Sequence, residues 1–424
     1  MIIIVYTPCN RGTISEQLGD AEYSYYFVLR EFLPILEQLG DVIHVESPEQ
    51  EVDSIYLRSK AEGKYCVFLS FTPPHKTYIN TLCPCIPVLA WEFDDIPSES
   101  WDDEPRNDWR LVLGKLGLAI THSRHSALAV KKALRDNFPV IAIPSPVWDR
   151  FRPRNEVDFH APATSFSLTV DGVVIDTKAD NFDLELDKNI NSYMSSDKTI
   201  QIDGLTYTSI LNPLDGRKNW QDIISAFCWA LQAASDATLI LKFTSRHNRE
   251  WPAMLRKVLE DMPPFECRVI VIKGYLDDDS YKALSESSTY AVNASKGEGQ
   301  CLPLMEYMSA GKPAISPNHT GMGDYITPNN SFVVATALEP VAWPDDTRRM
   351  YRTTQHRVDW ESLRDCFEKS YIVAKETPQE YGRLAKNAAE DLRRHCSRET
   401  VTQKLKKLFE FHQNSIETSS QLLQ

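Results

Sequence analysis

The stretch "NASKGEGQCLPLMEYMSAGKPAISP" carries two carboxylates at the start of an expected helix. Glu298 has a glycine before it and Gly299 after it, and seven residues separate it from Glu306. Glycine permits a tight turn and a close approach of a ligand to the backbone. Pro303 suits the first turn of a helix, which we expect over residues 303–310. Anions bind favourably at such a helix N-terminus. The backbone amides at this helix start belong to Gln300, Cys301 and Leu302.

The acidic pair indicates which ligand would suit this helix start. Carboxylates repel a pyrophosphate, but they accept hydrogen bonds from hydroxyl groups on either side of it. One side is a ribose diol and the other a hexose, and each bond to a charged acceptor contributes about 1.5–3 kcal/mol. The spacing of Glu298 and Glu306 therefore suits a sugar nucleotide. A capped helix with a surface salt bridge is the plainer interpretation.

A basic pair upstream supplies the opposite charge. In "LNPLDGRKNW", Arg217 and Lys218 follow an apolar strand and precede a helix, at the edge of the sheet where ligands are expected. A guanidinium and an ammonium together match a diphosphate and would stabilise it as a leaving group. The alternative is a solvated turn, since exposed charges contribute little by themselves.

The elements that must position these residues form two series of alternating strands and helices, which predict parallel sheets covered on both faces. In the first series, strands are expected at 2–8, 41–47, 65–71, 87–93, 118–123 and 140–147, and helices at 23–38, 107–117 and 124–137. In the second series, strands are expected at 207–212, 237–243, 267–274, 289–295, 313–317 and 331–335. Its helices are expected at 220–234, 250–261, 280–287, 303–310, 359–374, 378–394 and 398–413.

Residues 155–203 break this alternation. The segment "SFSLTVDGVVIDT" alternates around Asp171 and Gly172, a dipeptide that predicts a hairpin turn. We therefore expect an inserted hairpin and linker here, between an N-terminal domain at 1–154 and a C-terminal domain at 204–395. A helix in residues 396–424 completes the chain.

The fold class expected is α/β, with two doubly wound Rossmann-like domains. Ligands of such sheets bind beyond the carboxyl ends of the strands, so we expect the active site in a cleft between the domains. Because each domain supplies only part of the site, we also expect the domains to close when a donor binds.

Composition narrows the classes of partner. The 424 residues are 42% hydrophobic and 25% charged, as in a globular protein with a large core. The net charge of -13 argues against a nucleic-acid binder, although a local basic patch is compatible with it. Nine scattered cysteines predict reduced thiols in a cytosolic protein. No apolar run approaches the roughly 20 residues of a membrane-spanning helix, and the N-terminus lacks a basic leader.

The acidic pair, the "AGKPAIS" that follows it and the Arg217–Lys218 loop together resemble a GT-B-fold retaining glycosyltransferase, similar to family 4, the glycosyl transferases group 1. The resemblance covers most of residues 206–335. It extends more loosely over residues 1–150, through topology and "WEFDDIP". The sequence departs from the family pattern at two positions of this loop. The family often has Phe where Gln300 stands and Gly where Cys301 stands. The family's basic residues are also usually several positions apart.

The resemblance implies roles for individual residues. Glu298 would contact donor sugar hydroxyls in catalysis, and Glu306 the ribose. The basic pair would hold the pyrophosphate, assisted by the helix start from Gly299 to Leu302. The loop at Gly274 and Tyr275 would frame the base. The reaction would retain the anomeric configuration without metal or cofactor, with the leaving phosphate acting as base. The last helix would cross back onto the N-terminal domain.

Three further candidates lie on the expected acceptor side. Many members of the family carry a His where Glu92 stands, so Glu92 could take that catalytic place or serve as a structural acid. His75 follows two prolines and either lines the cleft or is a plain loop histidine. Ser123 stands at an N-cap position, which explains this segment simply, whereas Arg124 beside it could meet an anionic acceptor.

Two charged segments have both a plain and a functional interpretation. "LDDDSYKAL" resembles the acidic metal motif of the other transferase fold, but it precedes a helix, where aspartates act as caps, so we expect capping and no metal. Lys131, Lys132 and Arg135 share one helix face. That face is either solvated or in contact with a membrane-bound, phosphate-linked acceptor.

The sequence thus predicts a cytoplasmic hexosyltransferase, at the inner face of the membrane, that adds sugar to a glycan or lipid-linked acceptor in bacterial surface polysaccharide or lipopolysaccharide synthesis. Peripheral membrane contact fits this function. One alternative is a non-catalytic, sugar-nucleotide-binding partner subunit. Another is a phosphorylase-like enzyme with pyridoxal phosphate on a lysine.

Overall fold

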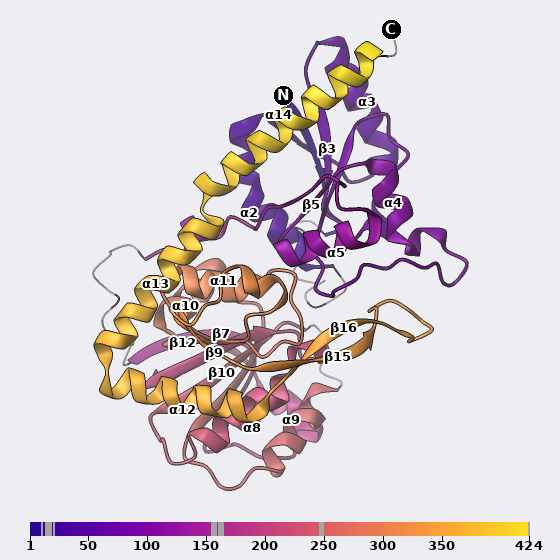
Figure 1. Ribbon diagram of the computed structural model, residues 1–424. Helices are drawn as coiled ribbons and strands as arrows, with labels where there is room; N and C mark the ends of the chain where they lie inside the picture. The colour runs from indigo at the N-terminus through magenta and orange to yellow at the C-terminus, as the bar shows by residue number, and fades with distance from the viewer. Residues whose placement is uncertain are drawn as a thin grey trace.

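A computed structural model describes residues 1–9, 12, 19, 22–153, 159, 165–245 and 250–422. Within these ranges the chain forms two α/β halves, one above the other in Figure 1. Most of residues 10–21, which follow the first strand, lie outside the described residues, as do most of residues 154–164 in the expected linker.

The described N-terminal residues form a parallel sheet of six strands in the order β2-β1-β3-β4-β5-β6. The strands are β1 (Ile2–Tyr6), β2 (Asp41–His44), β3 (Cys66–Ser70), β4 (Cys85–Leu89), β5 (Ala119–Thr121) and β6 (Val140–Ala142). The helices are α2 (Ser24–Leu39), α3 (Pro48–Ala61), α4 (Trp109–Leu116), α5 (Arg124–Leu134) and α6 (Trp148–Phe151). Strands β1 and β3 are almost wholly buried, because helices cover both faces of a parallel sheet.

The C-terminal half is built on a second sheet, in which the described residues form eight strands in the order β14-β13-β12-β9-β10-β11-β7-β8. The strands are β7 (Ser165–Asp176), β8 (Met194–Asp203), β9 (Leu205–Leu211), β10 (Ala237–Phe243), β11 (Arg268–Lys273), β12 (Tyr290–Val292), β13 (Ala314–Ser316) and β14 (Ser331–Val333). The helices are α7 (Leu186–Asn189), α8 (Trp220–Ala230), α9 (Trp251–Glu260), α10 (Asp278–Ser287), α11 (Leu302–Ser309), α12 (Trp360–Glu376) and α13 (Pro378–Cys396).

The prediction of a hairpin turn at Asp171 and Gly172 is wrong. Strand β7 runs straight through both residues and pairs antiparallel with β8 and with β11. The register shifts between Val170 and Gly172, so the glycine marks a β-bulge. Gly172 has φ 138°, and a Cβ there would lie 2.3 Å from the carbonyl oxygen of Lys273. The glycine therefore serves close strand packing, and β7 and β8 extend the C-terminal sheet.

The last helix, α14 (Arg398–Leu422), returns to the N-terminal half. In Figure 1 it rises in yellow from the end of α13 and runs along the N-terminal sheet. Its apolar face lies in the core that β1, β3 and α2 build. The buried side chains on this face are Val401, Leu405, Leu408 and Phe409.

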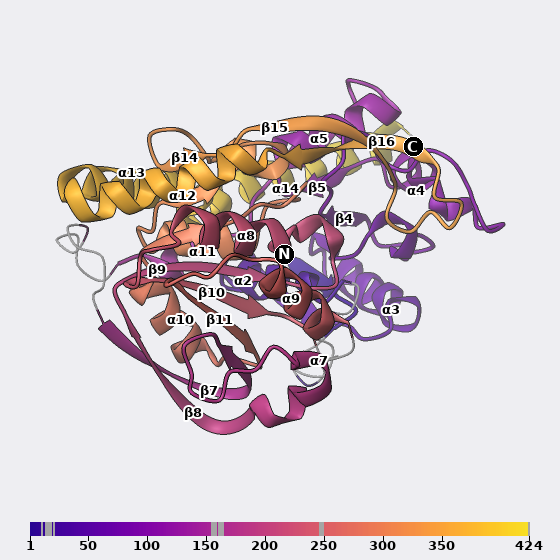
Figure 2. The ribbon, with the colours of Figure 1, turned by 90° about the horizontal axis from the view of Figure 1, so that it is seen from below.

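An antiparallel arm also joins the two halves. It consists of β15 (Thr336–Ala342) and β16 (Tyr351–Val358), and Figure 2 shows it reaching from the C-terminal sheet to α4 and α5. At its tip, Trp343 is buried in an apolar cluster of the N-terminal half. Its ring stacks on Trp101 with centroids 6.0 Å apart, and its Nε1 donates to the carbonyl of Asp95. This arm was not expected from the sequence.

None of the helices in the described part of the chain combines the length and apolarity that crossing a membrane requires. All nine cysteines lie within the described ranges and are free thiols.

Candidate functional site

A cavity of about 550 Å³ lies between the two halves. Both halves contribute to its walls, as expected for a site at the carboxyl ends of two facing sheets. Its N-terminal walls include Glu92, Arg150 and six residues at the start of α2 and just before it, which are Glu22, Tyr23, Ser24, Phe27, Val28 and Arg30. Its C-terminal walls come from the loops after β9, β10 and β11 and from the start of α11.

The start of α11 presents open backbone amides to this cavity. Cys301 precedes the helix in the left-handed region, with φ 58° and ψ 73°, and no side chain caps the helix. A helix N-terminus without a side-chain cap leaves its N–H groups to water or to a ligand. Gln300 anchors the loop to the N-terminal half, because its side-chain amide exchanges hydrogen bonds with the backbone and hydroxyl of Ser145.

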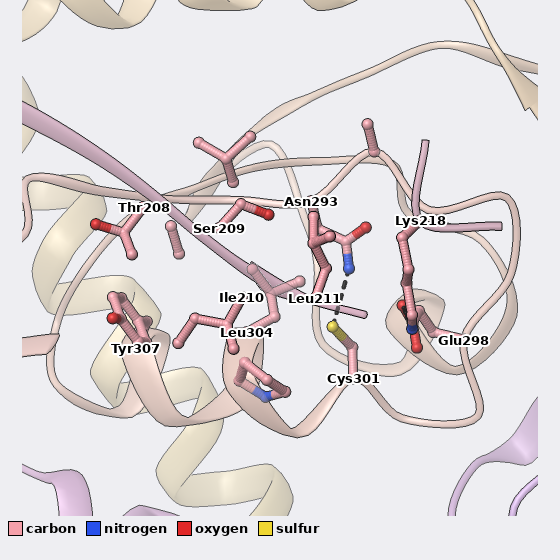
Figure 3. A pocket seen from close by; sticks show the side chains of 14 residues that line it. Thr208, Ser209, Ile210, Leu211, Lys218, Asn293, Glu298, Cys301, Leu304 and Tyr307 are labelled. Carbon is pink, nitrogen blue, oxygen red and sulfur yellow. Dashed lines mark hydrogen bonds and ion pairs between the residues drawn. The ribbon is translucent and has the colours of Figure 1, made fainter. Parts of the chain in front are cut away.

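Glu298 and Lys218 form an ion pair beside this helix start, with 2.6 Å between Oε1 and Nζ. Figure 3 shows the two side chains meeting next to Cys301, whose sulfur accepts a hydrogen bond from Asn293. Burial disfavours the charge of Lys218, but Glu298 and the weaker effects of Asp215 and Cys301 together outweigh it and raise the pKa of Lys218 above its ordinary value. The backbone N–H of Glu298 donates to the hydroxyl of Thr320, which fixes the loop.

Arg217 connects the two halves. Its guanidinium binds Asp215 of its own loop through two atoms and reaches Glu92 of the N-terminal half. Burial raises the pKa of Glu92, although Arg217 acts in the opposite direction. Arg217 and Lys218 are thus neutralised by the carboxylates of Glu92, Asp215 and Glu298. All five residues line the cavity.

Glu306 lies in α11 and lines the same cavity, with partners other than those of Glu298. It accepts a hydrogen bond from the hydroxyl of Tyr281. Burial raises the pKa of Glu306 to about 7, so its charge is only marginally stable near neutrality. Beside it, Arg150 and Arg30 of the N-terminal half share Glu31 and Asp278 as ion-pair partners.

The glycines around Glu298 allow the two halves to touch. A Cβ on Gly299 would lie 3.1 Å from the Cβ of Ala90, and one on Gly297 would lie 3.1 Å from the carbonyl oxygen of Glu92. A Cβ on Gly321 would lie 2.2 Å from the carbonyl oxygen of Gly299. These glycines therefore permit close packing of backbone segments from both halves at the edge of the cavity.

Most of the residues predicted for the site meet at this cavity. Those that line it are Glu92, Arg217, Lys218, Tyr275, Glu298, Gly299, Gln300, Cys301, Leu302 and Glu306. Three predicted residues are not among its lining. Gly274 packs against β7, where a Cβ would lie 2.1 Å from the carbonyl oxygen of Asp171. His75 stacks on Trp109 and accepts its Nε1–H. Arg124 pairs with Asp324.

The plain interpretations of the capping segments are confirmed. The side chain of Ser123 accepts a hydrogen bond from the backbone of Ser126. In "LDDDSYKAL", Asp277 caps α10 by accepting from the backbone of Ser280. Lys132, from the basic helix face, pairs with Asp95.

Several residues of the cavity were missed by the sequence analysis. Tyr281, Arg150 and Arg30 reach it from segments that show no local sign of a site. Lys242 did leave a signal, because it is a lysine within the otherwise apolar strand "ATLILKF". Asp215 lies two residues before Arg217, so an ion pair between them could also have been predicted from the sequence.

Comparison with known proteins agrees with this architecture. Residues 205–352 match the model of the family Glycosyl transferases group 1. HepE from Anabaena, solved with UDP and glucose, shares 14% identity and a TM-score of 0.54, over 96% of this chain and 99% of HepE. Sucrose-phosphate synthase from Thermosynechococcus elongatus shares 13% identity and a TM-score of 0.55, over 98% of this chain and 99% of that one. The chain thus has the GT-B fold of glycosyltransferases.

A third structure shows the same GT-B fold within a longer protein. TarM from S. aureus, solved with fondaparinux, alpha-GlcNAc-glycerol and UDP, has 12% identity and a TM-score of 0.52. The match covers 81% of the GT-B chain described here but only 55% of TarM. No curated protein sequence matches the chain significantly. The fold class expected from the sequence, α/β with two Rossmann-like domains, is confirmed.

Proposed function

We propose that the protein is a retaining hexosyltransferase. It takes the sugar from a nucleotide-diphosphate donor and transfers it to a glycan or glycolipid acceptor, in the synthesis of a bacterial surface polysaccharide. Neither a metal ion nor a cofactor takes part in the proposed reaction. The glycosyl transferases group 1 region and the UDP found in HepE and TarM support a sugar-nucleotide donor.

The observation that carries this proposal is the set of charges around the uncapped start of α11. Arg217, Lys218, Glu298 and Glu306 all line the cavity, and Lys218 is paired with Glu298. A diphosphate at the helix start would draw the two cations to itself, because its charge exceeds that of a single carboxylate. Glu298, released from Lys218, would then accept hydrogen bonds from sugar hydroxyls.

The chemistry proposed for this site is a substitution at the anomeric carbon. The bond from that carbon to the diphosphate oxygen breaks, and a bond to the acceptor oxygen forms on the same face. The acceptor's proton passes to the departing phosphate oxygen. Arg217, Lys218 and the helix N-terminus would stabilise the negative charge that develops on the leaving group. Glu92, which reaches Arg217 from the N-terminal half, would face the sugar from the acceptor side.

Incubation with a panel of sugar nucleotides and glycan acceptors tests this function. The wild-type protein should consume one donor and form a glycoside of unchanged anomeric configuration. Glu298→Ala should lower turnover at least ~100-fold, because it removes hydroxyl contacts and leaves Lys218 without its partner. Glu286→Ala is the matched control, because Glu286 is a partly exposed glutamate on α10 that does not line the cavity.

Two outcomes would contradict the proposal. Equal turnover by wild type and Glu298→Ala would refute the assignment of the site. Tight nucleotide binding without turnover on any acceptor would favour the non-catalytic partner subunit instead.

A further inference from the structure

Lys242 is a lysine in the interior of the C-terminal sheet. It is the penultimate residue of β10, where its register neighbours are Ile210 of β9 and Ile272 of β11. Only 5% of its surface is exposed, yet it lines the cavity between the two halves. A lysine is almost never buried to this degree unless it is paired.

Lys242 has no hydrogen-bond or ion-pair partner among the residues that the structure describes. Burial alone lowers its pKa to about 8, so the side chain is still mostly protonated near neutrality. A buried ammonium without an acceptor is costly for the free protein. An acceptor oxygen on a bound ligand would remove that cost. The hydrogen bond from Lys242 would then contribute to the free energy of ligand binding.

The surroundings of Lys242 indicate which part of a ligand would approach it. Ile210 and Leu276 line the cavity with it, and Leu276 belongs to the loop after β11 together with Tyr275. Apolar side chains beside a buried cationic donor fit a flat heterocycle that carries an oxygen acceptor. Phosphates are a poorer match, because the cations proposed to hold them, Arg217 and Lys218, follow β9 and pair with Glu92 and Glu298.

We propose that Lys242 donates a hydrogen bond to a keto oxygen of the donor's nucleobase. It thereby selects nucleotides with a keto base, such as uracil, thymine or guanine, over adenine nucleotides, which lack such an oxygen. This inference rests on the proposed function, because it assumes that the donor is a nucleotide. It assigns the base preference to a strand residue, in addition to the loop at Tyr275.

Calorimetric titration with UDP, dTDP, GDP and ADP tests this assignment. The wild-type protein should bind the best keto nucleotide at least ~10-fold more tightly than ADP. Lys242→Met should abolish that preference by weakening keto-nucleotide binding about 10-fold or more, the effect of losing one hydrogen bond to a charged donor, and should leave ADP affinity unchanged. Methionine keeps the volume and removes the buried charge, so the melting temperature without nucleotide should be equal or higher.

Lys273→Met is the matched control, since Lys273 is a partly buried lysine on the neighbouring strand that does not line the cavity. It should keep the base preference. An equal loss of affinity for all four nucleotides in Lys242→Met would place the contact at the phosphates or ribose and overturn the assignment. A wild-type protein without preference for keto bases, or a preference that survives Lys242→Met, would also overturn it. If the wild type binds no nucleotide at all, the proposed function itself fails.

Discussion

Glu306 is a carboxyl group whose surroundings disfavour its charge. Burial raises its pKa from 4.5 to about 7. Between these values the folded protein holds a proton that the unfolded chain has released, so the free energy of unfolding falls as the pH rises. The stabilisation linked to this proton is complete below about pH 4.5. It is lost as the pH passes through about 7.

Glu306→Gln should remove this pH dependence. We expect the variant to gain stability relative to the wild type from pH 5 to pH 7.5, by up to about 3 kcal/mol. Chemical denaturation of both proteins at the two pH values measures the difference. A difference that is the same at both pH values would show that Glu306 titrates normally.

Spacing alone was enough to predict Glu298, Glu306 and the basic pair. It was not enough to predict their pairing in the free protein. Lys218 and Glu298 are 80 positions apart, and Arg217 and Glu92 are 125 apart. Contacts at such separation depend on how distant segments of the chain pack together, and the Arg217–Glu92 pair also depends on how the two halves meet. A local pattern encodes neither. Tyr281, the partner of Glu306, was not predicted either, because their contact depends on how α10 packs beside α11.

Among the elements, the loop after β13 holds the helix start in place. Gly321 donates its N–H to the carbonyl of Glu298, and its Cα lies against the backbone of Gly299. Gly321→Ala would place a methyl group 2.2 Å from a carbonyl oxygen, so the loop must shift. We expect a loss of stability of about 1–3 kcal/mol and weaker nucleotide binding.

The matched control for this loop is Gly114→Ala. Gly114 lies in α4, and a Cβ there meets nothing within 4 Å. Alanine should therefore stabilise the helix by up to about 1 kcal/mol. Thermal unfolding and UDP titration of both variants make the comparison. Equal melting temperatures for the two variants would contradict the packing described for Gly321.

Helices and strands whose buried apolar side chains recur at regular spacing could be predicted from the sequence. Elements without such a pattern could not. Helix α3 was missed because, of its residues, only Pro48, Val52 and Ser59 are buried, so it shows no apolar stripe. Strands β15 and β16 were missed because most of their side chains are partly or fully exposed. At Asp171 and Gly172 a local turn preference gave the wrong prediction, since pairing with β8 and β11 overrode it.

For the whole molecule, the arm at residues 336–358 fixes how the two halves face each other. Trp343→Ala should empty a buried site in the N-terminal half. It should lower the free energy of unfolding by about 3–5 kcal/mol. Because the stacked contact with Trp101 crosses between the halves, we also expect a larger radius of gyration in small-angle scattering.

Tyr351→Ala tests whether this effect is specific to the tip. Tyr351 lies on the same arm but is 71% exposed, so its loss should change neither quantity. An unchanged radius of gyration in Trp343→Ala would show that the arm does not hold the halves together. Closure on donor binding stays a prediction, and the same scattering experiment with and without UDP measures it.

The route of α14 has a consequence for how the protein is made. Val401, Leu405, Leu408 and Phe409 complete a core whose other strands and helix lie near the start of the chain. While the ribosome is still adding the second domain, the first exposes the apolar groove that these side chains will fill. Only when the final helix emerges can this core reach the packing of the complete fold.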